Sequence, residues 1–397
     1  MNNLAVSGGK PHITEPYPSY PAWDENEKEA LIEVLESGIW GGYNPKVKQF
    51  EAAFSSYHQC RFGITAANGT VTLETALLAA GIGPGDEVIV PPISFIATAT
   101  AVLRVGAVPV FVDVDGSTLN LDPAAVSAGI TPRTRAIIPV HFAGQPADMD
   151  ELMKVAGSNG LTVIEDCAHA HGATWRGQPV GSFGDLGSFS FQASKNLTAG
   201  EGGILTTNDE QLAEAARSIC NQGRRTGGAW YEHVRLGTNL RITGWQAAVL
   251  LTQLARLPDQ IQKRESNTSV LNGILSELES IRLVHVDERV TCHSNYLYLV
   301  RLDLEALPGV TKNNFVKALA AEGVPCAAGY PQPLYRNAVF LDHKHVANEC
   351  TEAERMCADT FWLSHEVLLA DKQQVKDAGE AILKVAAAAD EVAKIGD

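Results

Sequence analysis

From residue 62 onward, short apolar runs alternate with segments of helical periodicity, and this alternation restricts the chain to a small set of folds. Several of the runs are apolar at every position, which is typical of strands that are covered on both faces. Such strands alternating with helices predict an α/β fold around a mostly parallel, seven-stranded sheet built from βαβ units. The predicted strands are residues 62–65, 87–90, 108–112, 136–140, 162–165, 187–191 and 203–206.

The residues before this region carry different signals. The first twenty are rich in Pro, Gly and Tyr, which predicts an extended arm rather than a packed element. Asp24 and Glu27 have the spacing of a capping box at the start of a helix, and Gly38 is a typical helix stop. A second amphipathic helix is expected after the glycine-rich loop that follows.

The pattern changes again after a helix predicted over residues 243–257. The later predicted elements are a helix over 261–278, strands over 281–284 and 296–302, a helix over 313–321 and a last long helix from Asp371. We therefore expect an N-terminal arm and large domain over residues 1–255 and a smaller α+β domain over residues 256–397.

Charge and cysteine content limit the partners and the compartment. The net charge of −15 over 397 residues argues against nucleic acid or an anionic membrane as a partner. The seven cysteines are odd in number and form no CxxC pair, so we expect a reducing, cytoplasmic location with no zinc site and no disulfide framework. No apolar signal region and no run of about 18 apolar residues is present, so we expect no membrane span.

Polar residues follow the predicted strands, at the sheet edge where ligands of parallel sheets bind. Asn68-Gly69-Thr70 follows one strand and opens a helix, which suits a phosphate cradle, although helix capping alone would explain these residue types. Asp166 ends an apolar strand, where a carboxylate needs a partner such as a protonated pyridinium nitrogen; a turn cap is the alternative. His169, three residues later, could donate to a phenolate oxygen or be structural.

Lys195 follows the strand that ends in Ser190-Phe191 and precedes a glycine-rich turn. Burial lowers the pKa of a lysine amine and makes it a nucleophile toward an aldehyde such as pyridoxal phosphate (PLP), whereas an exposed lysine would only reach solvent. Phe95 could stack on a flat ring or belong to the core. Each signal is weak alone, but a phosphate cradle, a ring stacker, a carboxylate and a lysine on successive strand ends predict a PLP site.

These motifs together resemble those of the DegT/StrS family, whose members are fold type I, PLP-dependent aminotransferases acting on keto-sugars and keto-cyclitols. The resemblance runs from about Trp23 to the C-terminal helix. The segments that carry it are Asn68-Gly69-Thr70, Asp113-Val114-Asp115, Pro139-Val140-His141, residues 166–169, residues 190–195, Gly200-Glu201-Gly202-Gly203 and residues 237–241.

The resemblance implies a role for each matching residue. Lys195 would hold PLP as a Schiff base and shuttle a proton, and Asp166 would pair with the pyridinium nitrogen. The other cofactor-binding residues that it implies are Gly69, Thr70, Val71 and Ser190 at the phosphate, Phe95 on the ring face and His169 near the ring hydroxyl. Asn239 would reach the phosphate of the neighbouring subunit, because the family's sites are shared across a homodimer.

Two segments bear on the amino acceptor. Residues 329–335 begin with Gly and end with Tyr, where nucleotide-sugar members typically have histidines, and residues 361–369 resemble the cyclitol and aminohydroxybenzoate branches. The resemblance thus implies transfer of an amino group from glutamine or glutamate to a cyclic ketone, a keto-cyclitol such as scyllo-inosose. The alternatives are an NDP-4-keto-hexose aminotransferase, an aminohydroxybenzoate-synthase-like enzyme, and a non-catalytic binding protein, which the intact Lys195 and Asp166 disfavour.

Overall fold

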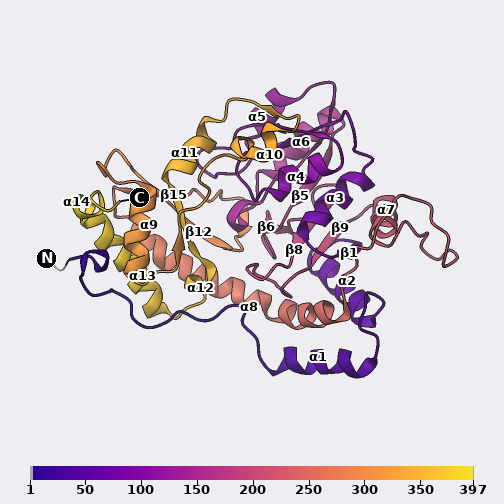
Figure 1. Ribbon diagram of the computed structural model, residues 1–397, viewed down its shortest axis with the longest axis horizontal. Coiled ribbons are helices and arrows are strands. Elements are labelled where there is room, and N and C mark those ends of the chain that lie inside the picture. The colour runs from indigo at the N-terminus through magenta and orange to yellow at the C-terminus, as the bar shows by residue number, and fades with distance from the viewer. Residues whose placement is uncertain (1–2, 397) are drawn as a thin grey trace.

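A mixed sheet of eight strands forms the centre of the larger half of the molecule (Figure 1). The structure, a computed structural model, describes residues 3–396. The strand order is β1-β9-β8-β5-β4-β2-β3-β14, and β9 runs antiparallel to both of its neighbours while the other pairings are parallel. The strands are β1 Phe62–Ala66, β2 Glu87–Val90, β3 Val108–Phe111, β4 Thr134–Ile137, β5 Thr162–Asp166, β8 Leu186–Ser190, β9 Gly203–Thr207 and β14 Val346–Ala347.

The predicted α/β class and mostly parallel sheet are confirmed, with two corrections. The sheet has eight strands rather than seven, because β14 pairs with the edge strand β3. Both residues of β14 are exposed, so no hydrophobic pattern marks it. The strand predicted over residues 136–140 is β4, which starts two residues earlier and ends at Ile137.

Helices cover both faces of this sheet, as the continuously apolar strands predicted. On β2, Val88 and Val90 pack with α3, α4 and α7, while Ile89 packs with α5 and α6 on the opposite face. The helices of this half are α1 Glu25–Ser37, α2 Pro45–Tyr57, α3 Gly69–Ala79, α4 Ala97–Arg104, α5 Pro123–Gly129, α6 Met149–Asn159 and α7 Glu210–Cys220. The capping box of Asp24 and Glu27 starts α1, and Gly38 ends it in the left-handed conformation, as predicted.

The smaller half is an α+β unit around an antiparallel sheet of order β10-β12-β15-β13. Its core joins Val300, Phe315, Phe361 and Ile382. The strands are β10 Ile281–Leu283, β12 Leu297–Leu302, β13 Cys326–Ala327 and β15 Thr360–Ser364, and the helices are α9 Lys312–Ala321, α10 Ala338–Leu341, α11 Thr351–Asp359, α12 His365–Leu368, α13 Lys372–Ala387 and α14 Ala389–Val392. A third small sheet joins β11 (Val290–Cys292), β6 (Thr174–Trp175) and β7 (Gln178–Pro179).

One long helix, α8 (Gly244–Leu275), runs beneath both halves (Figure 1). Two helices were predicted here, and that prediction is wrong. Leu254, Leu257 and Ile261 are buried along one face on both sides of Pro258, and this packing outweighs the cost of an internal proline. Residue 255, at which we divided the chain, therefore lies inside a continuous helix, and the division itself stays a prediction.

The N-terminal arm is packed, which corrects the prediction of an unpacked segment. Leu4 and Ile13 are buried in the core of the smaller half. The main-chain N–H groups of Ala5 and His12 each donate to the carboxylate of Glu322 at 2.9 Å. The arm therefore lies along the smaller half before it reaches α1. Across residues 3–396, no helix combines the length and the apolar character needed to cross a bilayer.

Candidate active site

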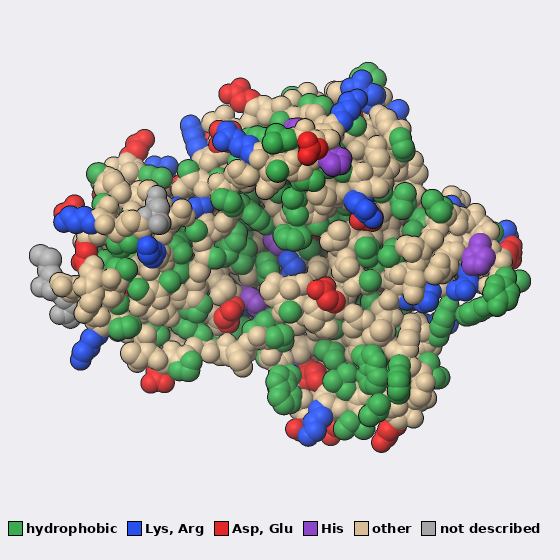
Figure 2. Space-filling model, in the orientation of Figure 1, with side chains coloured by type: hydrophobic (Ala, Val, Ile, Leu, Met, Phe, Trp, Pro, Cys, Tyr) green, Lys and Arg blue, Asp and Glu red, His purple; other side chains and the backbone are tan. Residues whose placement is uncertain are grey.

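A cavity of about 700 Å³ opens where β5 and β8 end, at Asp166 and Ser190. In the space-filling view, the middle of this face is hollowed, with a basic side chain and histidines at its floor (Figure 2). The predicted site residues that line the cavity are Gly69, Thr70, Val71, Phe95, Asp166, His169, Ser190 and Lys195. Asn239 does not line it. This geometry brings the lysine and the carboxylate into one cavity.

Lys195 lies in the loop between β8 and β9, and its amine faces the cavity. Burial lowers the pKa of Lys195 from 10.5 to about 8, while the charge of Asp166 acts in the opposite direction. The Nζ atom lies 4.5 Å from the ring centroid of Tyr296, a cation–π contact. At neutral pH such an amine has a larger neutral, nucleophilic fraction than an ordinary lysine.

Asp166 is buried at the end of β5 and is held by two donors. The Thr98 hydroxyl donates to Oδ2 at 2.8 Å, and the Ala168 N–H donates to Oδ1 at 3.2 Å. Burial raises the pKa of Asp166, against the effect of these hydrogen bonds and of Lys195. A protonated ring nitrogen beside Asp166 would supply a positive charge that favours its ionised form.

The start of α3 forms the predicted cradle. Asn68 caps the helix by accepting from Val71 N at 3.0 Å, which leaves the first N–H groups, those of Gly69 and Thr70, without an intrahelical partner. A Cβ at residue 69 would lie only 2.6 Å from the Cβ of Ser190, so only glycine allows the helix start to approach the end of β8 this closely. These donors and the Ser190 hydroxyl suit a phosphate.

His169 and Phe95 lie at the same cavity. Burial lowers the pKa of His169 well below 6.5, so its imidazole is neutral, and its buried Nδ1 has no hydrogen-bond partner within the described chain. Phe95 is 59% exposed, which argues against the alternative of a core residue and leaves its ring free to stack.

Further residues line the site: Tyr296 and Thr98 were not predicted, whereas Glu201, Tyr330 and Trp362 lie in segments that the sequence singled out without a role for the individual side chain. Tyr296, Tyr330 and Trp362 form an aromatic wall, and Glu201 adds a carboxylate. Thr98 lies in the first turn of α4, and its hydroxyl also lies 2.7 Å from that of Ser94 in the loop before the helix, a contact that no helical spacing predicts. The aromatic wall comes from the smaller half of the molecule, and no local pattern connects it with the lysine.

Asn239 lies apart from this cavity within the same chain. It is exposed and forms an isolated bridge with Asn221. Its predicted contact was with the neighbouring subunit, and that contact stays a prediction.

The site fits PLP. The buried carboxylate suits a pyridinium nitrogen, the neutral imidazole of His169 suits a ring hydroxyl, and the donors at the start of α3 suit a phosphate. The amine of Lys195 suits the aldehyde carbon.

Comparison with known proteins agrees with this geometry. The model of the DegT/DnrJ/EryC1/StrS aminotransferase family matches residues 21–382. L-glutamine:2-deoxy-scyllo-inosose aminotransferase of Streptomyces fradiae is 39% identical over 416 residues, which cover 97% of this chain and 98% of that protein. The crystal structure of 3-amino-5-hydroxybenzoic acid (AHBA) synthase is 36% identical, with a TM-score of 0.89 and coverage of 94% of this chain and 99% of that one. The structure of DesI in the presence of its TDP-sugar product is 30% identical, with a TM-score of 0.87 and coverage of 98% and 97%.

Proposed function

Because the chain belongs to the DegT/DnrJ/EryC1/StrS aminotransferase family and is a PLP-dependent transaminase of fold type I, we propose that it aminates a keto-cyclitol with glutamine as donor. The acceptor in this proposal is scyllo-inosose or a deoxy relative. The donor gives up its amino group and leaves as its keto acid, and the ketone then receives that amino group. The observation that carries the proposal is the cavity that holds Lys195 and Asp166 together with an aromatic wall.

Each residue of the cavity has a role in this proposal. PLP, when bound, delocalises the negative charge that develops at the carbon bearing the amino group. Nζ of Lys195 would bind the aldehyde carbon and, once displaced by the donor, would carry the proton taken from the donor's α-carbon. Asp166 would keep the ring nitrogen protonated. The N–H groups of Gly69 and Thr70 would bind the phosphate, with Val71 and Ser190 beside them, while Phe95 would cover one ring face and His169 would meet the ring hydroxyl.

The residues that line the cavity favour a cyclitol over a nucleotide sugar as the amino acceptor. Among the residues of this chain that line the cavity, Lys195 is the only Lys or Arg. A nucleotide diphosphate is normally bound by several cationic or N–H groups. The aromatic rings of Tyr296, Tyr330 and Trp362 suit the C–H face of a six-membered ring, and Glu201 can accept from its hydroxyl groups.

A substrate comparison tests this function. The PLP-loaded protein is incubated with glutamine and one ketone at a time: scyllo-inosose, its 2-deoxy form, or a TDP-4-keto-hexose, and product masses are followed. We expect amination of a cyclitol ketone and little turnover of the nucleotide sugar. Turnover of the nucleotide sugar alone would contradict the proposal. The likeness to AHBA synthase supports a second candidate, for which 3-amino-5-hydroxybenzoic acid is the product to seek.

Substitution of Lys195 tests the assigned nucleophile. We expect Lys195→Ala to abolish transamination, because no other amine lines the cavity on the described chain. The far-ultraviolet circular dichroism should be unchanged, since the variant removes a buried cationic group and no core contact. A variant with near-normal turnover would refute the role given to Lys195.

The proposal includes a homodimer with shared sites, in the cytoplasm. Large apolar side chains gather on the surface around α1 (Figure 2). Trp23 and Leu35 are more than half exposed, and they line a groove of about 720 Å³ with Trp245. Such a patch is typical of a protein–protein interface.

All seven cysteines are free, which supports the reducing compartment.

A further inference from the structure

The N-terminal arm touches the loop that carries Lys195. The hydroxyl of Tyr20 donates to the main-chain carbonyl oxygen of Lys195 at 2.5 Å. Across residues 3–396, no other hydrogen bond to this carbonyl is present. No step of the proposed reaction involves the arm.

The hydrogen bond from Tyr20 is one of three that hold the backbone around Lys195. On the preceding side, the Lys195 N–H donates to the carbonyl of Gln192 at 2.9 Å. On the following side, the Asn196 amide side chain donates to the carbonyl of Ser294 at 2.7 Å. The bond from Tyr20 fixes the peptide plane between these two points. Since the direction of the lysine side chain follows the rotation of its backbone, the bond from Tyr20 sets where Nζ points.

Tyr20 is itself held on a rigid support. Its ring packs edge-on against His365, with 4.2 Å between the ring centroids. Two residues on, the carbonyl of Ala22 accepts from Gln253 at 2.8 Å and from Arg256 at 2.9 Å, and both donors lie on α8. Burial raises the pKa of Tyr20 to about 12, so its hydroxyl keeps the proton that it donates.

A buried arginine extends this support. Arg264 of α8 is fully buried, and its Nη2 lies 3.1 Å from Nδ1 of His365. The contact joins α8 to α12, whose first residue, His365, packs against the Tyr20 ring. Contacts with α8 and α12 therefore hold Tyr20 in place and fix the position of its hydroxyl beside Lys195.

We propose that Tyr20 is a positioning residue for Lys195 and that the N-terminal arm is thereby a functional part of the PLP site. The inference rests on the assignment of Lys195 as the PLP-binding lysine. Without the bond from Tyr20, the loop populates orientations in which the amine is misdirected. The apparent affinity for PLP falls in proportion to the fraction of competent molecules.

The arm offers a matched control. The hydroxyl of Tyr17 donates to the main-chain carbonyl of Gln374 at 3.3 Å, in the smaller half and away from the lysine. Tyr17→Phe and Tyr20→Phe therefore each remove one hydroxyl-to-carbonyl bond from the same arm. Equilibrium dialysis of the apo-protein measures the dissociation constant of PLP, the visible absorption band reports the bound form, and thermal unfolding reports stability.

We expect Tyr20→Phe to raise the dissociation constant of PLP about tenfold, because the partly buried carbonyl of Lys195 loses its partner. Its kcat should fall while the KM for glutamine stays near the wild-type value. Tyr17→Phe should leave the PLP dissociation constant within about twofold of wild type. Tyr20→Phe should unfold at the lower temperature of the two, because the bond that it loses is the shorter one, 2.5 Å against 3.3 Å.

Two results would overturn the inference. One is a PLP dissociation constant for Tyr20→Phe within about twofold of wild type. The other is an equal loss of affinity in Tyr17→Phe, which would assign the effect to general loosening of the arm. Lys195→Ala separates this inference from the proposed function: a variant that still transaminates would refute the assigned lysine, whatever Tyr20→Phe does.

Discussion

The amine of Lys195 lies in surroundings that make it reactive before any substrate arrives. Burial removes water from the charged form, and Asp166 in the same cavity restores part of its stability. The result is a pKa of about 8, below the usual 10.5. Without Asp166, burial would lower the pKa of Lys195 further. The carboxylate therefore limits the cost of burying the charged amine while leaving a reactive neutral fraction.

The rate at which the apo-protein captures PLP should follow this pKa. Only the neutral amine attacks an aldehyde, so the second-order rate constant should rise about tenfold per pH unit at low pH and level off above pH 8. Stopped-flow absorbance across the pH range measures it. A rise that continues through pH 10 would show an ordinary lysine.

Asp166→Asn provides the control for this pH profile. The charge of Asp166 raises the pKa of Lys195, so its removal should move the midpoint to lower pH. A midpoint that moves upward would contradict the electrostatic coupling between the two residues.

At the scale of residues, the sequence predicted those members of the site that directly follow strands. The strands β1, β5 and β8 run in the same direction and end at one edge of the sheet, so Gly69, Asp166 and Lys195 could be grouped from the strand pattern alone. Tyr20 and Tyr296 come from the arm and from the smaller half. Their positions depend on how the two halves pack, which no local pattern encodes.

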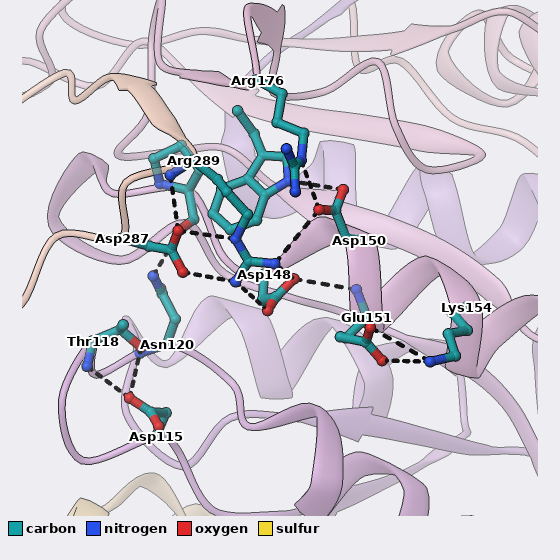
Figure 3. A network of polar contacts seen from close by, with 12 residues as sticks. Asp115, Thr118, Asn120, Asp148, Asp150, Glu151, Lys154, Arg176, Asp287 and Arg289 are labelled. Carbon is teal, nitrogen blue, oxygen red and sulfur yellow. Dashed lines mark hydrogen bonds and ion pairs between the residues drawn. The ribbon is translucent and has the colours of Figure 1, made fainter.

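At the scale of elements, a network of ion pairs fastens residues 285–296 to the larger half (Figure 3). Nη2 of Arg289 lies 2.7 Å from a carboxylate oxygen of Asp148 and 2.7 Å from one of Asp287, and the guanidinium stacks on Trp175. The hydrogen bond from Arg289 lowers the pKa of Asp287 to about 2. This segment leads directly into Tyr296, so the network helps to fix the aromatic wall of the cavity.

Loss of Arg289 should therefore destabilise the fold. We expect Arg289→Met to lower the free energy of unfolding by about 1–3 kcal/mol, because it leaves partly buried carboxylates without their cation. Chemical denaturation measures the change. Lys154→Met is the matched control, since Lys154 pairs with Glu151 at 3.0 Å but is 71% exposed. That pair should contribute less than about 1 kcal/mol, and equal losses in both variants would contradict a special role for Arg289.

The elements that the sequence predicted well are those buried on both sides. Strands such as β3 are apolar and buried throughout, and their bounds follow from composition. The two-residue strand β14 is exposed, and its pairing with β3 depends on tertiary contacts alone. Helix α8 misled the prediction for the opposite reason: a proline that usually marks a boundary is tolerated where both flanking turns are buried.

At the scale of the whole molecule, the apolar surface around α1 and the position of Asn239 both bear on the proposed dimer. Leu236, three residues before Asn239, is 97% exposed, and Tyr231 is 83% exposed. The chain has a net charge of −15 and yet exposes these large side chains. Such exposure is typical of a surface that a partner covers. In a two-fold dimer, each subunit would present this loop to the other's cavity.

Mixed dimers test whether the sites are shared. Lys195→Ala and Asn239→Ala, co-expressed with different affinity tags, give hybrids in which one site keeps its own Lys195 and the partner subunit's Asn239. If Asn239 serves the neighbouring subunit, that site is intact, and a random mixture should regain about a quarter of the wild-type transaminase rate. Hybrids purified through both tags should approach half of the wild-type transaminase rate.

The matched control pairs Lys195→Ala with Asp166→Asn. Both residues line the same cavity of one chain, so every site of that hybrid lacks one of them and no activity should return. Restored activity in the Asn239 hybrid alone requires a site built from two chains. If neither hybrid gains activity although both purify as stable dimers, Asn239 acts within its own subunit or not at all. If the protein sediments as a monomer at assay concentration, the exposed surface around α1 needs another explanation.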